Sequence, residues 1–232
     1  MPTEPWTWRQ SWRDLLFAHW PIDAARLRPL IPQGLTLQEF DGSAWIGVVP
    51  FRMTGVMVRP LPDLPWISAF PEINVRTYVE CDGKSGVWFF SLDATNPLAV
   101  WAAQTFFHLP YVRARMSFQR KGDDITYQSD RVVGDARFAG SYGPTSPVYR
   151  SQPGTLDHWL TERYCLFAQD RRGQLIRNDV HHEPWPLQNA RAEIATNTML
   201  SPVGLSVDGP PPQLHFAERI DVVVWSGVPA TP

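Results

Sequence analysis

Lysine and cysteine are both scarce in this 232-residue chain. Only Lys84 and Lys121 are lysines among its 21 basic residues, so the other 19 are arginines. The two cysteines, Cys81 and Cys165, lie far apart in the sequence. They have neither the paired spacing of a zinc site nor the density of a secreted disulfide scaffold. We therefore predict a protein of a reducing compartment, the cytoplasm, that holds no metal.

A strong net charge and a long apolar run are missing as well. The formal net charge is −2, which provides no general field to attract nucleic acid or anionic lipid. No stretch approaches the roughly 18 consecutive apolar residues of a membrane helix. The first residues carry tryptophans, arginines and Glu4 where a signal peptide needs an apolar run. These absences argue against nucleic-acid and membrane partners, and they leave oligomerisation open.

Apolar residues, by contrast, are abundant. They make up 44% of the chain against 19% charged residues, a composition typical of a packed globular protein. All-β barrels commonly reach this length as single units, so we predict one domain over residues 1–232. The 23 prolines are scattered between apolar runs, which indicates many irregular connections between short strands.

Alternation of polar and apolar residues predicts strands in many places. The segment Glu72–Cys81 alternates strictly, and Asp82-Gly83 is a favourable turn into a returning strand at residues 86–92. Tyr111–Arg120 alternates again. Further strands are expected at residues 35–40, 44–51, 125–128, 132–138, 190–196 and 219–225. So many short strands predict a mainly β fold, a barrel or a sandwich.

About three short helices complete the prediction, at residues 96–110, 155–167 and 23–30. Asn96-Pro97 begins the first, Thr155 can cap the second, and Asp23 can cap the third. Arg163 falls on the apolar face of the second helix, four residues after Trp159. Because a guanidinium cannot shed its charge, a buried Arg163 needs an acidic partner, carbonyl groups or an anionic ligand. We expect either an internal ion pair, with Glu72 or Asp93, or a bound anion.

Four polar side chains share one face of the strand at residues 72–81, namely Glu72, Asn74, Arg76 and Tyr78. If this face points into a barrel, Glu72 could act as a general acid or base. Arg76 could then bind a carboxylate or an enolate. If the face points outward, the same residues form an ordinary polar strand surface.

Three histidines are further candidates. His181 and His182 precede Glu183 in a proline-rich loop, but adjacent histidines rarely face one metal ion, and no other zinc motif accompanies them. His181 could contact a ligand or transfer a proton. His19 lies among aromatic residues and could be catalytic or a buried neutral ring. Motifs of nucleophilic triads and phosphate-binding loops are absent.

Several segments become informative when they are taken together in chain order. They are Phe17-Ala-His-Trp-Pro-Ile-Asp23, Leu27–Pro32, Asp41–Phe51, Glu72–Val79, Gly86–Asp93, Leu109–Tyr111, Leu160–Tyr164 and Pro184–Leu187. Over roughly residues 12–225 the chain thereby resembles the YqjF-like family of uncharacterised proteins. The resemblance implies an acetoacetate decarboxylase-like fold, a cone-like barrel of antiparallel and mixed strands around a buried cavity.

The same resemblance gives the shortage of lysine a functional meaning. Acetoacetate decarboxylases form a Schiff base on a lysine that follows a proline, whereas the similar position here reads Pro110-Tyr111-Val112. Lys84 and Lys121 stand beside hairpin glycines, where neither is desolvated into a nucleophilic amine. Schiff-base chemistry is therefore not expected. The resemblance also implies a site acid on the strand before the hairpin, where Glu72 is similar in placement.

The leading hypothesis is a barrel cavity that binds a small organic acid or carbonyl compound. Arg76, Arg163 and Arg113 would meet its anionic end, and Tyr111 and Trp185 would line the apolar wall. If the protein is an enzyme, Glu72 or a histidine would move protons without a cofactor.

Two alternatives remain open from the sequence. One is a non-catalytic structural or interaction protein that is fixed by a buried ion pair between Arg163 and Glu72. The other, weaker one is metal-dependent hydrolysis at His181 or His182.

Overall fold

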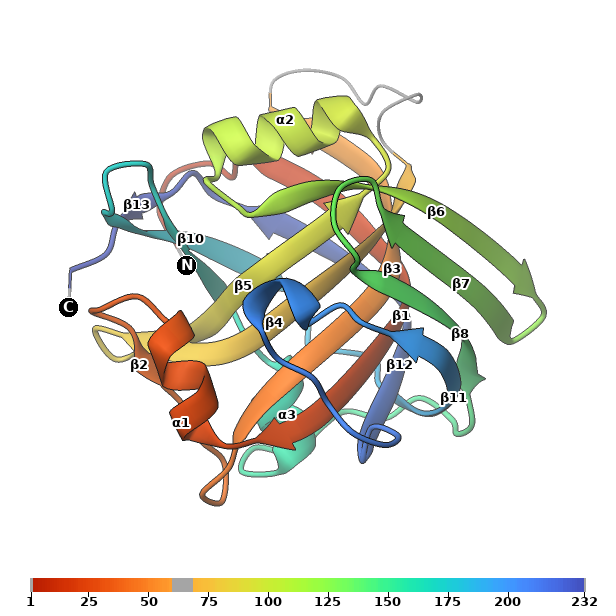
Figure 1. Cartoon of the computed structure of the whole chain (residues 1–232). Coiled ribbons are helices and arrows are strands. Elements are labelled where there is room, and N and C mark those ends of the chain that lie inside the picture. Colours follow the sequence, from red (N-terminus) through yellow and green to blue (C-terminus); the bar gives the residue numbers. More distant parts are fainter. Residues whose placement is uncertain (1, 60–68, 232) are drawn as a thin grey trace.

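The computed structural model describes residues 2–59 and 69–231, and strands dominate it (Figure 1). The strands are β1 (Trp8–Ile22), β2 (Thr36–Leu37), β3 (Ala44–Val58), β4 (Phe70–Cys81), β5 (Lys84–Ala94), β6 (Tyr111–Lys121), β7 (Asp124–Arg131), β8 (Arg137–Pro144), β9 (Cys165–Gln169), β10 (Leu175–His182), β11 (Gln188–Asn197), β12 (Gln213–Val224) and β13 (Val228–Pro229). The helices are α1 (Ala24–Leu27), α2 (Pro97–Phe106) and α3 (Leu156–Thr161), with 3₁₀ turns η1 (Arg28–Leu30) and η2 (Ser201–Val203). The predicted mainly β barrel with short helices is confirmed.

The strands close into two rings that share one sheet. Strands β12, β1, β3, β4 and β5 pair in that order and form the shared sheet. The sheet forks at β5, which pairs with both β6 and β9, and at β12, which pairs with both β11 and β10. One branch, β6–β7–β8–β11, closes a nine-strand ring, and the other, β9–β10, closes a seven-strand ring. Both faces of the shared sheet are therefore covered.

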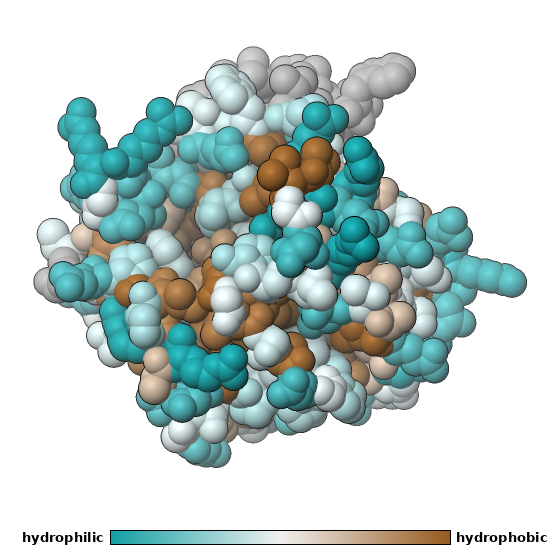
Figure 2. Space-filling view, in the orientation of Figure 1, coloured by the Kyte–Doolittle hydropathy of each residue, from teal (hydrophilic) through white to brown (hydrophobic). Residues whose placement is uncertain are grey.

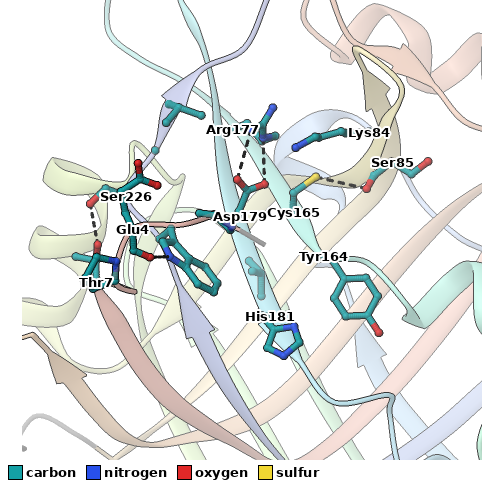
Figure 3. Close-up of a pocket in the computed structure, with 16 residues that line it drawn as sticks. Glu4, Thr7, Lys84, Ser85, Tyr164, Cys165, Arg177, Asp179, His181 and Ser226 are labelled. Carbon is teal, nitrogen blue, oxygen red and sulfur yellow. Dashed lines mark hydrogen bonds and ion pairs between the residues drawn. The ribbon is translucent and has the colours of Figure 1, made fainter.

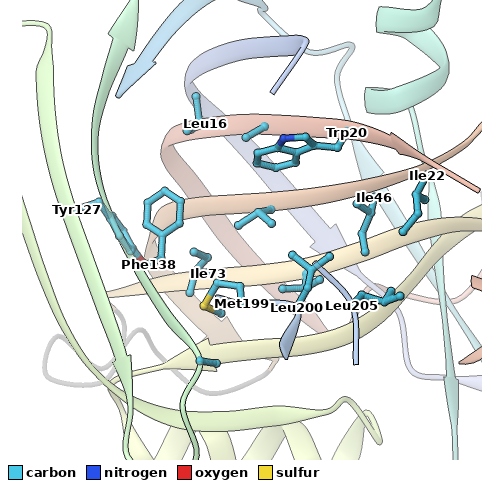
Figure 4. Packing of buried hydrophobic residues seen from close by; sticks show 14 of the residues in the cluster. Leu16, Trp20, Ile22, Ile46, Ile73, Tyr127, Phe138, Met199, Leu200 and Leu205 are labelled. Carbon is cyan, nitrogen blue, oxygen red and sulfur yellow. The ribbon is translucent and has the colours of Figure 1, made fainter. Parts of the chain in front are cut away.

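The nine-strand ring has an apolar interior (Figure 4). Ile73 and Val75 of β4 belong to the same cluster as Tyr127 of β7 and Phe138 of β8. Met199, beside η2, packs into the same cluster. Burial of each large apolar side chain contributes about 1.5–3 kcal/mol, so this ring is a stabilising core. On the face of the molecule that Figure 1 presents, apolar side chains gather in a hollow near the middle, with polar ones around them (Figure 2).

The seven-strand ring has an interior that mixes apolar and polar side chains. Its apolar part draws residues from all seven strands, namely Phe17, Val49, Phe70, Leu92, Leu166, Val180 and Val222. Val49 and Leu92 are the partners of Asn74 in the sheet register. Because successive side chains of a strand point to opposite faces, the four polar residues of β4 face this ring. Their exposure is 1% for Glu72, 5% for Asn74, 8% for Arg76 and 0% for Tyr78. The interpretation of this face as a solvent-exposed strand surface is therefore wrong.

The predicted elements differ from the structure in several places. His181 and His182, expected in a proline-rich loop, are the last two residues of β10. The helix capped by Thr155 ends at Thr161, and residues from Cys165 form β9, so Arg163 lies in a connection rather than on a helix. No strand covers residues 132–136, since β7 ends at Arg131 and a turn with Gly134 at φ +99° follows. The hairpin of β4 and β5, the turn of α1 and η1, and α2 are confirmed. No helix in residues 2–59 or 69–231 has the length and apolar character needed to span a membrane.

Candidate functional site

A buried arginine without a carboxylate partner lies inside the seven-strand ring. The Arg76 Cζ atom is 5.2 Å from the centre of the Phe17 ring and 5.8 Å from that of Tyr78. Its Nη2 makes one long contact, 3.5 Å, to the carbonyl oxygen of Leu160, and its Nε is shut off from solvent with no partner. None of the ion pairs among the described residues includes Arg76. Among the described residues, aromatic faces and one long carbonyl contact surround the positive charge, and no carboxylate pairs with it.

Arg163 approaches the same tyrosine ring. Its Cζ lies 5.0 Å from the Tyr78 ring centre and 4.6 Å from that of Trp159. Nε donates to the Trp159 carbonyl and Nη1 to Gln38 Oε1, but Nη2 is buried without a partner. Burial, followed by a smaller contribution from Arg76, lowers the pKa of Arg163 to about 10. We call Arg76, Arg163 and Tyr78 the arginine cluster.

The ion pair expected for Arg163 does not form. Glu72 instead accepts a hydrogen bond from the Tyr111 hydroxyl, and Asp93 forms a two-bonded ion pair with Arg131 of β7. Within the described part of the chain, no carboxylate neutralises Arg163. The prediction of a structural protein fixed by an Arg163–Glu72 pair therefore loses its basis.

His19 completes one side of the arginine cluster. The Tyr78 hydroxyl donates its only proton to the Leu160 carbonyl at 2.8 Å, so it must accept at 2.7 Å from His19 Nε2. Burial, then the charge of Arg76, lowers the pKa of His19 well below its usual value, and the ring is neutral. Its Nδ1 is then an acceptor, and it is buried without a partner.

Gly47 allows this approach of His19 and Arg76. It lies opposite both residues in the sheet, between β1 and β4. A Cβ atom at this position would stand 2.9 Å from the His19 ring and 3.4 Å from Arg76 Cγ. Any larger residue would push the imidazole or the guanidinium away, so the glycine is what lets the two side chains cross the strand.

Glu72 forms a second polar group further along β4. The Tyr111 hydroxyl donates to Glu72 Oε2 at 2.7 Å, and both side chains are buried. Burial raises the pKa of Glu72 from 4.5 to about 8, with the Tyr111 hydrogen bond opposing the shift and the charge of Asp93 adding to it. At neutral pH the side chain is a carboxylic acid that can donate a proton. Four residues of strand, about 13 Å, separate it from Arg76, and Asn74 lies between them with an unpartnered Oδ1.

The raised pKa of Glu72 has a measurable effect on stability. The folded protein holds this proton more tightly than the unfolded chain does, so the group's contribution is full below pH 4.5 and is lost as the pH rises to about 8. Glu72→Gln should remove this pH dependence. Urea unfolding at pH 5 and at pH 8 measures this effect. The free energy of unfolding of the wild type minus that of the variant should be smaller at pH 8 than at pH 5. A difference that does not change with pH would show that Glu72 is ionised in the folded protein.

A histidine that the sequence reasoning missed also faces this interior. His215 of β12 is 3% exposed, and its Nε2 lies 3.0 Å from Asp157 Oδ1 of α3. The Tyr149 hydroxyl donates to the other carboxylate oxygen of Asp157 at 2.9 Å. His215 lies far along the chain from Tyr149 and Asp157 and shares no motif with them, so only the fold could reveal this group.

The remaining predicted site residues are divided between the interior and the surface. Trp185 is 2% exposed and packs on Trp12 and Phe17. Tyr111 is buried through its bond to Glu72. Arg113 lies on the exposed side of β6, where it lines a separate cavity of about 400 Å³ with Met116.

The two adjacent histidines of β10 point to opposite faces. His181 lines a cavity of about 1050 Å³ together with Lys84, Arg177 and Asp179 (Figure 3). His182 is buried and stacks on Tyr164. A single ion held by both is therefore incompatible with the strand geometry. Over residues 2–59 and 69–231, no group of three or more histidine, cysteine or acidic side chains is placed to hold a metal ion.

Both lysines lie at the ends of hairpins, away from the arginine cluster. Lys84 and Lys121 are exposed where β5 begins and β6 ends. The residue that follows Pro110 in the interior is Tyr111, whose hydroxyl is occupied by Glu72. The geometry thus offers cations and acid–base groups, but no interior amine for covalent catalysis.

Comparison with known proteins agrees with this architecture. Residues 9–221 match the family DUF2071, described as an uncharacterized conserved protein. The uncharacterized protein YqjF of Bacillus subtilis (strain 168) is 46% identical over 226 residues, which cover 97% of this chain and 93% of that protein.

Solved structures of low sequence identity share the fold. Acetoacetate decarboxylase from Legionella pneumophila superposes with a TM-score of 0.64 at 15% identity, over 99% of this chain and 92% of that one. The enduracididine biosynthesis enzyme MppR, in complex with pyruvate, gives 0.66 at 13% identity over 99% and 91%. An acetoacetate decarboxylase-like enzyme from Sphingomonas wittichii RW1 gives 0.63 at 12% identity over 98% and 94%. The chain therefore belongs to the DUF2071 family and has an acetoacetate decarboxylase-like fold.

Proposed function

We propose that this protein binds a small organic acid, such as a carboxylate that also carries a carbonyl group, at the arginine cluster inside the seven-strand ring. One observation carries the proposal: the buried Arg76 has no carboxylate partner among the described residues. Arg163 adds a second unneutralised cation on the same tyrosine ring. The ligand's carboxylate would provide the missing negative charge.

The energetics of burial support this assignment. An ionised side chain that leaves water costs several kcal/mol unless a counter-ion or strong hydrogen bonds compensate. Cation–π contacts of the kind Arg76 makes return about 2 kcal/mol when they are desolvated, which is less than that cost. A carboxylate has two acceptor oxygens, so it could accept one charge-assisted hydrogen bond from Nε of Arg76 and one from Nη2 of Arg163, both of which are unpartnered.

The other groups of the interior limit the chemistry of the ligand. Phe17 and Trp159 form aromatic walls next to the guanidinium groups. Asn74 Oδ1 and His19 Nδ1 are unpartnered acceptors, and buried polar atoms are rarely left without a hydrogen bond. The ligand that fits is small, anionic at one end and partly apolar, and its hydroxyl, enol or amide group would be the donor. A structural neighbour, MppR, was solved in complex with pyruvate, a small 2-oxo acid whose enol form has such a donor.

Any reaction at this site would proceed by proton transfer. Glu72 is a neutral acid near pH 7 and could donate a proton to the end of a ligand that lies away from Arg76. The two lysines lie at exposed hairpin ends, so a Schiff base on this chain is excluded from the proposal.

Binding of pyruvate tests the proposal, with methyl pyruvate as the matched neutral ligand. Trp159 lies against Arg163, so tryptophan fluorescence should change on binding. The acid should bind and the ester should bind at least about 30-fold more weakly, because a charged hydrogen bond at a buried site is worth about 2 kcal/mol or more. Equal binding of acid and ester, or no binding of the acid, would contradict the proposal.

A further inference from the structure

We propose that His215, oriented by Asp157, is the base that removes a proton from the carbon beside the carbonyl group of the bound acid, so that the site enolises a 2-oxo acid. This inference rests on the proposed function, since it needs the acid to be bound at the arginine cluster. The Asp157–His215 pair makes it possible.

The hydrogen bonds of His215 determine which ring nitrogen is basic. The Asp157 carboxylate accepts hydrogen bonds from His215 and Tyr149. The bond from His215 is the largest cause that holds the pKa of Asp157 below its usual value, so this group is ionised and can only accept. His215 Nε2 therefore carries the proton, and in the neutral ring Nδ1 keeps a free electron pair. That Nδ1 is buried and has no partner.

The sheet register places His215 on the face of the sheet that carries the arginine cluster. His215 lies directly opposite Phe17 in the pairing of β12 with β1. The Arg76 guanidinium lies 5.2 Å from the same Phe17 ring. Side chains of directly paired residues share a face of the sheet, so His215 is a neighbour of Phe17, whose ring the guanidinium contacts.

His215 is better suited to accept a proton than His19. Removal of a proton creates an imidazolium ion, which the ionised Asp157 beside His215 stabilises. His19 bonds to a neutral phenol and lies near the positive charge of Arg76, and burial together with that charge disfavours its protonated form. His19 is thus a positioning acceptor, and His215 is the base.

The proton transfer balances within this site. The C–H bond next to the carbonyl group breaks, its proton forms an N–H bond at His215 Nδ1, and the electron pair moves through the new C=C bond to the carbonyl oxygen. The Arg163 guanidinium would stabilise the enolate oxygen. Return of a proton from Nδ1 to carbon regenerates the keto acid. In D₂O the proton on Nδ1 exchanges with solvent before the return step, so a deuteron is delivered to carbon and the cycle is visible without any net reaction.

The test is exchange of the pyruvate methyl protons in D₂O, followed by ¹H NMR, with pyruvate affinity measured on the same samples by fluorescence. The wild type should catalyse exchange. His215→Gln should slow it by at least about 100-fold, the usual contribution of a general base, while the affinity changes by less than about 2-fold. Asp157→Asn should slow exchange as well, and it provides a second variant if His215→Gln folds poorly. His158→Gln, one residue from Asp157 on α3, is the matched control and should exchange as the wild type does.

The two failures are distinguishable. Pyruvate binding without exchange in the wild type, or exchange in His215→Gln at the wild-type rate, would overturn the role of His215 and leave the proposed binding function standing. Absence of pyruvate binding by the wild type would overturn the binding function, and the enolisation inference would fall with it.

Discussion

Replacement of Arg76 by methionine is expected to abolish pyruvate binding while the unliganded protein keeps its stability or gains up to about 2 kcal/mol. Methionine fills a similar volume against Phe17 and Tyr78 without a charge to desolvate. Loss of a buried, hydrogen-bonded charge contact costs a ligand about 2–5 kcal/mol, or roughly 30- to several-thousand-fold in affinity. Lower affinity without lower stability is the result expected of a residue that serves ligand binding.

Fluorescence titration with pyruvate and urea unfolding measure the two effects of Arg76→Met. Arg113→Met is the matched control, because Arg113 is an arginine on the exposed side of β6. It should change neither quantity appreciably. If Arg76→Met destabilises the unliganded protein by more than about 2 kcal/mol and leaves affinity intact, Arg76 is a structural residue and the proposed site is wrong.

The largest loss of stability is expected from Arg131→Met. Arg131 of β7 donates two hydrogen bonds, of 2.8 and 2.7 Å, to Asp93 of β5, whose side chain is fully buried. The variant leaves that carboxylate without its partner, which typically costs about 3–5 kcal/mol. The pair also joins the shared sheet to the branch that closes the nine-strand ring, so its loss should loosen that closure.

Two further variants test whether the loss of stability comes from breaking the buried ion pair or from removing any arginine. Asp93→Leu combined with Arg131→Met should recover most of the lost stability, since an apolar pair of similar volume is often as stable as a buried ion pair. Arg137 and Asp130 form an exposed ion pair, with side chains that are 67% and 58% exposed, respectively. Arg137→Met should therefore lower the free energy of unfolding by less than about 1 kcal/mol. A loss below about 1 kcal/mol in Arg131→Met, measured by urea unfolding, would contradict the buried pair.

The architecture was predictable wherever one face of a strand is polar. Strict alternation predicted β4, and the turn at Asp82-Gly83 predicted its hairpin with β5. Strand β1 was not predicted, because all side chains from Leu15 to Trp20 are buried and a strand covered on both faces does not alternate. The short β9 was taken for the end of a helix for a related reason, since its buried residues are also compatible with helical spacing.

The candidate site was only partly predictable. The shared face of Glu72 and Arg76 followed from the period of two in β4, and the structure places both inside the seven-strand ring. The partners of these residues did not follow, because the contacts of Arg163 with Tyr78 and of Glu72 with Tyr111 depend on ring closure. The Asp157–His215 pair joins α3 to β12 and has no sequence signal at all. The strand register and the positions where the sheet forks decide which side chains meet across the barrel. Neither follows from composition or periodicity.

A crystal structure of the protein soaked with pyruvate tests the central claim most directly. We predict density for the acid inside the seven-strand ring, with its carboxylate oxygens about 2.7–3.0 Å from guanidinium nitrogens of Arg76 or Arg163. Density for pyruvate only outside this ring, with the nitrogens of both arginines bonded to protein groups alone, would contradict the claim.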